Sequence, residues 1–160
     1  MGSSRLLVGD VGGTNCRLAT FDGTLRDIRV WSTEEVSTLG EAAARYLEEF
    51  PARPDAAAVA VAGPVSGTTA RLTNTDWSAD LADLPCPGRL INDLHAAARG
   101  IGQLSSDDVI SLGGRPSPPG APMAIMGVGT GLGQALLIGD VIVPGEGGHI
   151  DWGRNSAMFA

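Results

Sequence analysis

A glycine-rich corner between two strand-like stretches is the feature that most restricts how this chain can fold. It lies in residues 8–21, VGDVGGTNCRLATF, where an apolar run precedes the glycines and partly alternating apolar residues follow them. Residues 125–137, IMGVGTGLGQALL, repeat the arrangement, and Gly9 aligns with Gly127. An internal repeat of this kind predicts two related lobes that face one cleft, each presenting the tip of a β-hairpin.

Glycines at such tips permit a sharp turn and let backbone N–H groups approach a ligand, as phosphate binding requires. Thr14 and Thr130 add hydroxyl donors to the two corners. Asp10 is an acid beside the first corner, which indicates a metal ion between carboxylate and phosphate; Mg²⁺ fits, because it keeps its waters and bridges to phosphates. Two plain hairpin turns without a ligand are the alternative, but the matched pair of corners favours phosphate binding.

Two other glycine-rich phosphate motifs do not fit this chain. A P-loop requires a lysine after its last glycine, and the chain contains no lysine. A dinucleotide-binding fingerprint opens a helix, whereas both corners here lead into strand-like segments. A dinucleotide-binding oxidoreductase domain is therefore disfavoured.

The remaining segments predict an α/β fold with mixed sheet pairing. We expect the element order β-β-β-α-β-α-β-α in the first part of the chain, with the helix at 39–50 ended by Pro51. The expected strands of this part are 5–10, 16–22, 26–33, 56–63 and 89–93, and the turn-rich residues 63–77 predict a hairpin at the edge of the lobe. We expect a small lobe over 1–104 and the start of a second lobe over 105–160, with a Pro/Gly-rich connector at 113–122.

Composition limits the partners and the compartment. The 160 residues carry a formal net charge of -7 with no run of basic residues, which argues against binding to nucleic acid or to an anionic membrane surface. No apolar run reaches the length of a membrane span, and the N-terminus does not resemble a signal peptide. Cys16 and Cys86 lie far apart and are expected to be reduced thiols, so we predict a cytoplasmic protein.

Two polar segments supply candidate catalytic and sugar-binding groups. Asn92 and Asp93 follow a predicted strand and precede a helix, where a carboxylate can project into a cleft and accept a proton; simple helix capping is the alternative. Glu146 and His149 lie three residues apart across two glycines and can clamp vicinal hydroxyls; a solvated loop is the alternative. A zinc site is disfavoured, because no cysteine lies near His149.

Taken together, the motifs resemble those of bacterial glucokinases. GDVGGTNCRLA, TNTDW, INDLHAAARG, GVGTGLG and PGEGGH occur in the order seen in that family, over nearly the whole chain. The family belongs to the hexokinase branch of the actin-like ATPase fold (ribonuclease H-like), so the resemblance implies a mixed five-stranded sheet lobe and the start of a second lobe. The related ROK sugar kinases usually carry a cysteine-rich zinc motif after the Gly-His loop, and HIDWGRNSAMFA has no cysteine.

The resemblance implies phosphorylation of glucose on its 6-hydroxyl, with ATP and Mg²⁺ as cofactors and Asp93 as the catalytic base. The residues implied for the ATP phosphates are Gly9, Asp10, Val11, Gly12, Gly13 and Thr14 in the first corner, with Asp10 near Mg²⁺, and Gly129, Thr130 and Gly131 in the second. Those implied for the glucose hydroxyls are Asn92, Glu146 and His149, with Thr73 and Asn74 near the sugar. Full-length relatives are expected to form homodimers.

The chain departs from the family in length. Family members are about twice as long, so a second sugar-binding glutamate and the adenosine pocket are expected beyond residue 160, and apolar surface is expected to be left uncovered. Two functional interpretations follow. The chain is either a glucokinase, seen complete or in part, or a truncated, non-catalytic relative that binds sugar or nucleotide as a sensor or interaction protein.

Overall fold

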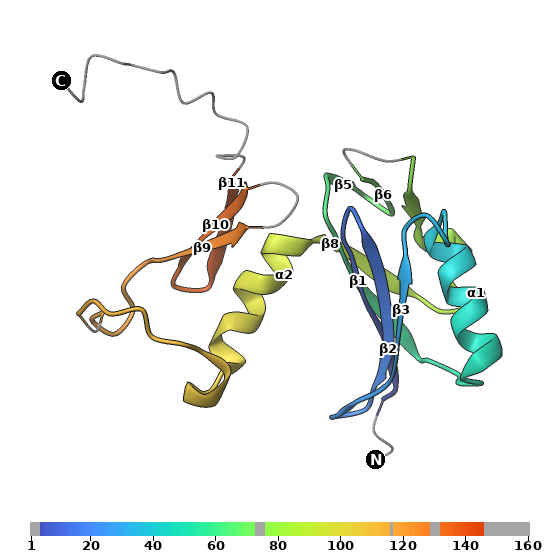
Figure 1. The fold of residues 1–160 in the computed structure, drawn as a ribbon, viewed down its shortest axis with the longest axis horizontal. Coiled ribbons are helices and arrows are strands. Elements are labelled where there is room, and N and C mark those ends of the chain that lie inside the picture. The colour runs from blue at the N-terminus through green and yellow to red at the C-terminus, as the bar shows by residue number, and fades with distance from the viewer. Residues whose placement is uncertain (1–3, 73–75, 116, 129–131, 146–160) are drawn as a thin grey trace. The chain divides into compact units, whose positions relative to one another are not determined.

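The computed structural model describes residues 4–72, 76–115, 117–128 and 132–145 (Figure 1). Contacts between residues divide the chain into two compact units, Met1–Ala96 and Ala97–Ala160, here called unit 1 and unit 2. The helices within the described ranges include none long and apolar enough to cross a membrane.

Unit 1 is built on a mixed five-stranded sheet with the strand order β3-β2-β1-β4-β8. Its strands are β1 (Leu6–Val11), β2 (Asn15–Phe21), β3 (Leu25–Ser32), β4 (Ala56–Val61) and β8 (Gly88–Asn92). The first three form an antiparallel meander, and β1, β4 and β8 are parallel to one another. This confirms the α/β fold and the mixed five-stranded sheet expected from the sequence.

Helix α1 (Leu39–Glu49) packs against this sheet through one apolar face. Thr38 caps its N-terminus, since the Thr38 hydroxyl oxygen accepts a hydrogen bond from the Glu41 N–H at 3.1 Å. The helix ends where Pro51 follows, as expected, because proline cannot continue the backbone hydrogen bonds. Its buried residues are Leu39, Ala42, Ala43 and Tyr46.

Between β4 and β8 the structure differs from the expected element order. The described residues there hold three short antiparallel strands and one 3-10 turn in place of the helix in that order, and β5 and β6 form the hairpin expected within residues 63–77. These elements are β5 (Val65–Ser66), β6 (Thr69–Arg71), β7 (Ser78–Asp80) and η1 (Leu81–Asp83). The segment is rich in Thr, Ser, Gly and Pro, which favour turns and short strands over helix.

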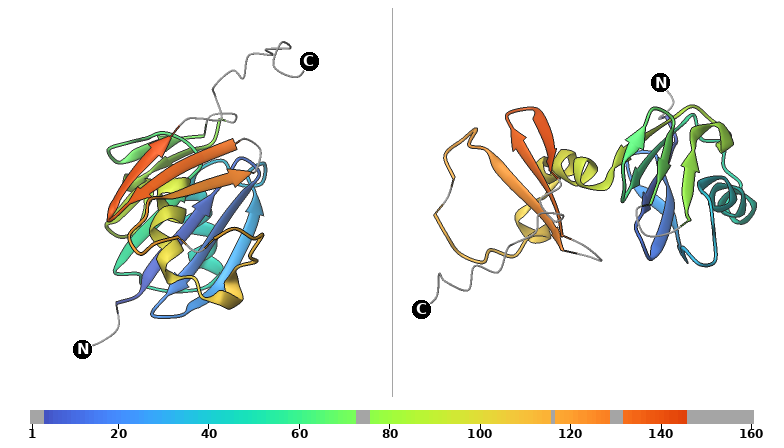
Figure 2. Two further views of the ribbon diagram at one scale, coloured as in Figure 1. Left: turned by 90° about the vertical axis from the view of Figure 1, so that its left-hand side faces the viewer. Right: turned by 90° about the horizontal axis from the view of Figure 1, so that it is seen from above.

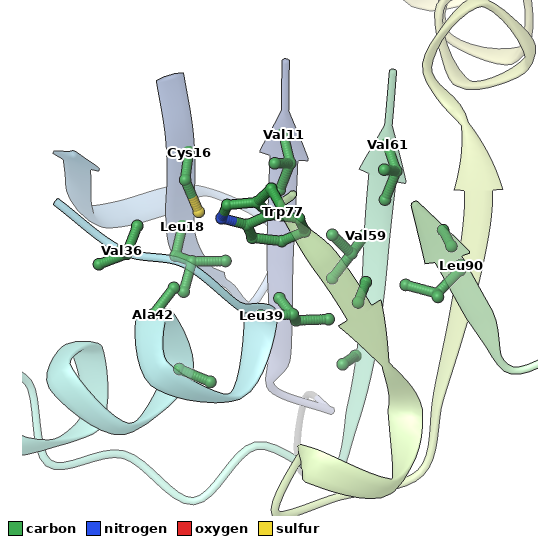
Figure 3. Close-up of a cluster of buried hydrophobic side chains, with 14 of the residues drawn as sticks. Val11, Cys16, Leu18, Val36, Leu39, Ala42, Val59, Val61, Trp77 and Leu90 are labelled. Atoms are coloured by element: carbon green, nitrogen blue, oxygen red, sulfur yellow. The ribbon is translucent and has the colours of Figure 1, made fainter. Parts of the chain in front are cut away.

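The small β5–β6–β7 sheet contributes a tryptophan to the core of unit 1. Trp77 is 2% exposed and belongs to the same buried cluster as Leu18 of β2 and Val59 of β4. Figure 3 shows its ring between these side chains. Burying an indole of this size removes a large apolar area from water, which ties the small sheet to the main one.

Unit 2 contains a three-stranded antiparallel sheet in the order β11-β10-β9 (Figure 2). The strands are β9 (Met123–Val128), β10 (Leu132–Ile138) and β11 (Val141–Gly145). Helix α2 (Asp93–Gly100) begins in unit 1 and ends in unit 2, and the 3-10 turns η2 (Ile101–Gln103) and η3 (Ser106–Asp108) follow it. The expected boundary between residues 104 and 105 stays a prediction.

Gly63, just after β4, should be sensitive to substitution. A Cβ built at this position would collide with the Arg71 carbonyl oxygen of β6, so Gly63→Ala must displace backbone. We expect it to lower the free energy of unfolding by about 1–3 kcal/mol in urea denaturation. Gly100→Ala is the control, because nothing lies within 4 Å of a Cβ there. Equal effects of the two substitutions would contradict this account of the packing.

Candidate active site

The candidate site lies where three parallel strands of unit 1 end. β1, β4 and β8 run in the same direction, so their carboxyl ends share one edge of the sheet. The register aligns Asp10 with Ala60 and Val61 with Asn92, which places Asp10 and Asn92 within one residue of the same level. Ligands of open α/β sheets bind outside the carboxyl ends of the strands, so this edge is the expected place for a site.

The first glycine corner follows β1 at this edge. The Gly12 N–H donates a hydrogen bond across the corner to the Asn15 carbonyl oxygen at 2.9 Å. Thr33 holds the corner from the side: its hydroxyl donates to the Gly13 carbonyl oxygen and its N–H to the Thr14 carbonyl oxygen, both at 3.0 Å. Two carbonyl oxygens, which would repel a phosphate, are thereby engaged by Thr33. Thr33 lies outside the glycine motif, so the sequence pattern did not point to it.

The glycines of this motif serve different purposes. A Cβ at Gly9 would lie 2.8 Å from Leu18 Cδ2 and 3.1 Å from Val59 Cγ1, so the absence of a side chain there lets β1 pack between its neighbours. A Cβ at Gly12 would meet only the Asn15 carbonyl oxygen, at 3.9 Å. Packing within the described residues therefore does not require glycine at position 12, which is consistent with space kept for a ligand.

Asp10 and Arg17 form an ion pair beside the corner. They face each other in the β1–β2 register, and Arg17 Nη1 lies 2.8 Å from Asp10 Oδ2. Both side chains are about half exposed, at 54% and 47%, so the pair is open to solvent and adds little stability. An exposed pair of this kind can be rearranged by a charged ligand at small energetic cost. Arg17 is a second residue beside the corner that the sequence motifs do not single out.

Asn92 fixes the corner between β8 and α2. Its side-chain oxygen accepts hydrogen bonds from the Leu94 and His95 N–H groups, both at 3.1 Å. Its Nδ2 donates to the Gly63 carbonyl oxygen at 3.5 Å, which links β8 to the end of β4. The Asn92 amide thus caps α2 and also connects two parallel strands at the candidate site, and its role toward a sugar stays a prediction.

Asp93 is the first residue of α2 and is partly buried. Burial raises the pKa of its carboxyl group, and the negative charge of Asp10 raises it further. Hydrogen bonding from the Leu94 N–H to Asp93 Oδ1, at 2.9 Å, opposes this shift. A carboxylate with a raised pKa is a stronger base than an exposed one, and perturbed acids of this kind are frequent at catalytic sites.

The cysteines do not add reactive groups to the site. Burial raises the pKa of the Cys16 thiol to about 12, so it stays protonated at neutral pH. Cys16 and Cys86 are both free thiols, as expected from the sequence. Within the described ranges, no group of three or more His, Cys, Asp or Glu side chains could hold a metal ion by itself. Asp10 remains the candidate metal-proximal carboxylate.

Several expected site residues lie outside the described residues. They are Gly129, Thr130 and Gly131 of the second corner, Glu146 and His149 of the sugar loop, and Thr73 and Asn74. The strands on either side of the second corner are described: β9 and β10 pair antiparallel, with Val128 opposite Leu132. The expected strand–corner–strand arrangement is therefore confirmed for the flanks of both glycine corners.

Comparison with known proteins identifies similar sequences. The family described as Glucokinase matches residues 7–159. The chain is 38% identical to the glucokinase of Tolumonas auensis over 166 aligned positions, covering 96% of this chain and 52% of that protein. It is 37% identical to the glucokinase of Yersinia enterocolitica, covering 96% and 51%. The chain thus spans about half the length of the curated relatives it matches.

Solved structures share the fold. A glucokinase from an Antarctic psychrotroph superposes with a TM-score of 0.75 at 29% identity, covering 92% of this chain and 51% of that one. A glucokinase from Balamuthia mandrillaris, solved in complex with glucose, gives 0.74 at 22% identity, covering 92% and 49%. A ROK family glucokinase from Streptomyces griseus, solved with glucose and AMPPNP, gives 0.65 at 20% identity, covering 89% and 47%.

The electrostatic coupling of Asp93 to Asp10 can be measured directly. Replacing Asp10 by Asn removes a nearby negative charge, so the pKa of Asp93 should fall, while burial should keep it above that of an exposed aspartate. NMR titration of the Asp93 carboxyl carbon in both proteins would show the shift. Asp107→Asn, at an exposed position in η3, is the control and should leave the titration unchanged. An unchanged Asp93 titration in Asp10→Asn would refute the coupling.

Proposed function

The chain belongs to the glucokinase family, and on this premise we propose that it carries the catalytic base and the first phosphate-binding corner of an ATP-dependent glucose kinase. The observation that carries the proposal is the partly buried Asp93, held within electrostatic reach of Asp10 at the carboxyl edge of three parallel strands. The chain spans about half the length of its relatives, so the glucose kinase activity of the whole protein is also a proposal.

In the proposed reaction Asp93 orients the 6-hydroxyl of glucose and accepts its proton. The bond from glucose O6 to the γ-phosphorus forms as the bond from that phosphorus to the β,γ-bridging oxygen breaks, with ADP as the leaving group. Such phosphoryl transfer depends mainly on alignment and charge stabilisation. The raised pKa of Asp93 suits a proton acceptor, and the Asn92 amide holds the first turn of the helix that bears it.

The residues of the first corner fit a nucleotide phosphate. Position 12 has room for a ligand, and Thr33 engages the Gly13 and Thr14 carbonyl oxygens. We assign Gly9, Val11, Gly12, Gly13 and Thr14 to phosphate binding, with Gly129, Thr130 and Gly131 as the second corner.

A magnesium ion fits beside Asp10. Mg²⁺ commonly uses one or two protein carboxylates together with waters and phosphates, and the half-exposed Asp10 carboxylate provides one. When bound, the ion would neutralise charge on the phosphates. Arg17, now paired with Asp10, would then be available to a phosphate oxygen.

The sugar would be held by the family's hydroxyl ligands. We assign Asn92, Glu146 and His149 to glucose, by their match to the family motifs. Asn92 then has two tasks, since its oxygen already accepts two backbone hydrogen bonds and its Nδ2 has a second hydrogen for a hydroxyl.

The proposal also includes a cytoplasmic location and, for the full-length protein, a homodimer. The net charge of -7 supports a small-molecule substrate over nucleic acid.

The second candidate function is that of a sensor or interaction protein. In that role the same candidate site would bind glucose or nucleotide without catalysing phosphoryl transfer. Binding of either ligand in calorimetry, without formation of glucose 6-phosphate, would establish this function in place of the kinase.

Asp93→Asn tests the catalytic assignment. Loss of a general base typically lowers turnover by about 10²–10⁴-fold, while glucose binding should change little. The measurement is a coupled assay for glucose 6-phosphate with ATP and Mg²⁺, for this chain and the variant. Asp107→Asn removes an exposed acid and should retain full activity. Equal activity of Asp93→Asn and the parent chain would remove Asp93 from the mechanism.

Gly12→Val tests the phosphate corner. The side chain would enter space that the described residues leave open, so stability should be nearly unchanged while ATP binding weakens by about tenfold or more. Calorimetric titration with ATP and Mg²⁺ measures the affinity, and thermal unfolding measures the stability. Gly102→Val provides the comparison, because nothing lies within 4 Å of a Cβ at that position and it is outside the corner. If both variants bind ATP like the parent, the corner is a plain turn.

A further inference from the structure

The turn that follows β3 holds the first glycine corner from one side. This turn, residues 32–35, is here called the supporting turn. Its Thr33 hydroxyl donates to the Gly13 carbonyl oxygen, and the Thr33 N–H donates to the Thr14 carbonyl oxygen, both at 3.0 Å. Thr33 is partly buried and lies 20 residues after Gly13 in the chain. One residue from a distant segment therefore engages two successive peptide groups of the corner.

These two hydrogen bonds decide which way the N–H groups of the corner point. In a trans peptide group the carbonyl oxygen and the N–H of the next residue point in opposite directions, and the described residues contain no cis peptide bond. Because Thr33 holds the Gly13 carbonyl oxygen, the Thr14 N–H is turned away from Thr33. Its bond to the Thr14 carbonyl oxygen turns the Asn15 N–H away in the same manner. Within the described residues no group accepts a hydrogen bond from the Thr14 N–H, and Thr14 is exposed.

The supporting turn is itself fixed in place. The Ser32 N–H donates to Glu35 Oε2 at 2.8 Å, and the Glu35 N–H returns a bond to the Ser32 carbonyl oxygen at 3.0 Å. The Glu34 N–H donates to Ser32 Oγ at 3.2 Å. The turn lies between Trp31 and Val36, which are 8% and 0% exposed and belong to the core of unit 1. Since packed cores resist displacement, the turn is a fixed support for the corner.

We propose that Thr33 is a positioning residue for the phosphate-binding corner. It keeps the Thr14 and Asn15 N–H groups directed toward the nucleotide phosphates, and it acts through the corner without touching the ligand. This inference rests on the proposed function of the corner. Donors that are already oriented need no ordering when the ligand binds, so loss of the support weakens binding. The effect is confined to the nucleotide, because the proposed sugar ligand Asn92 is held by hydrogen bonds of its own.

The test compares substitutions that remove or keep the Thr33 hydroxyl. Thr33→Val removes it at similar side-chain size, and Thr33→Ser retains it. Thr69→Val is the matched control, because the Thr69 hydroxyl also donates to a backbone carbonyl oxygen, that of Ser66 at 3.2 Å, but in the β5–β6 hairpin. Calorimetric titrations of this chain with ATP and Mg²⁺, and separately with glucose, measure the two affinities. Hydrogen exchange of the Gly12 amide, followed by NMR without ligand, measures opening of the corner.

Thr33→Val should weaken ATP binding and accelerate Gly12 exchange, each by about three- to tenfold, because one hydrogen bond is lost. Glucose affinity should stay unchanged, and Thr33→Ser and Thr69→Val should behave like the parent chain. A parent that binds ATP no more tightly than Thr33→Val does would overturn the positioning role alone. So would equal losses of ATP and glucose affinity, unchanged Gly12 exchange, or failure of Thr33→Ser to restore binding. A parent chain that binds no ATP would instead overturn the proposed function, and this inference with it.

Discussion

The parallel alignment of β1, β4 and β8 is the constraint on which the candidate site depends. Parallel strands end at the same edge of a sheet, so residues far apart in the chain, Asp10 and Asn92, reach the same level. The contact between the Asn92 amide and the Gly63 carbonyl oxygen joins the last two strands at this edge. Asp93 follows directly, and its pKa senses the charge of Asp10 across the width of β4.

The packing behind this edge explains why it can hold its geometry. Trp77 from the small sheet enters the core of the five-stranded sheet, and the close approach of Gly63 to Arg71 joins the two sheets near the end of β4. A densely packed core transmits displacement, so a side chain added at Gly63 would be felt at Asn92. The stability of unit 1 and the geometry of the candidate site therefore depend on the same backbone contacts around Gly63.

The strands and α1 were predictable because they depend on local pattern. Each of these local signals acts on residues only a few positions away. They are the apolar alternation, the Asp-Gly turn at Asp22 and the proline at position 51. The segment between β4 and β8 was not predicted in its details, because its short strands exist only through pairing with each other and through Trp77. Thr33 was missed for the same reason: its hydrogen bonds reach Gly13 and Thr14, about twenty residues earlier.

By itself the sequence determined the strand–corner–strand arrangement and the family, because motif order and residue type are properties of the chain. It also singled out Asp93 and Asp10 as candidate site residues. Only the tertiary structure decided which glycines are required by packing and which leave room for a ligand, since that depends on what neighbouring strands place around each Cβ. It also decided which apolar residues are covered. In unit 2, for example, Ala135 is 1% exposed, whereas Val128 and Val141 on the other face of the sheet are 86% and 63% exposed.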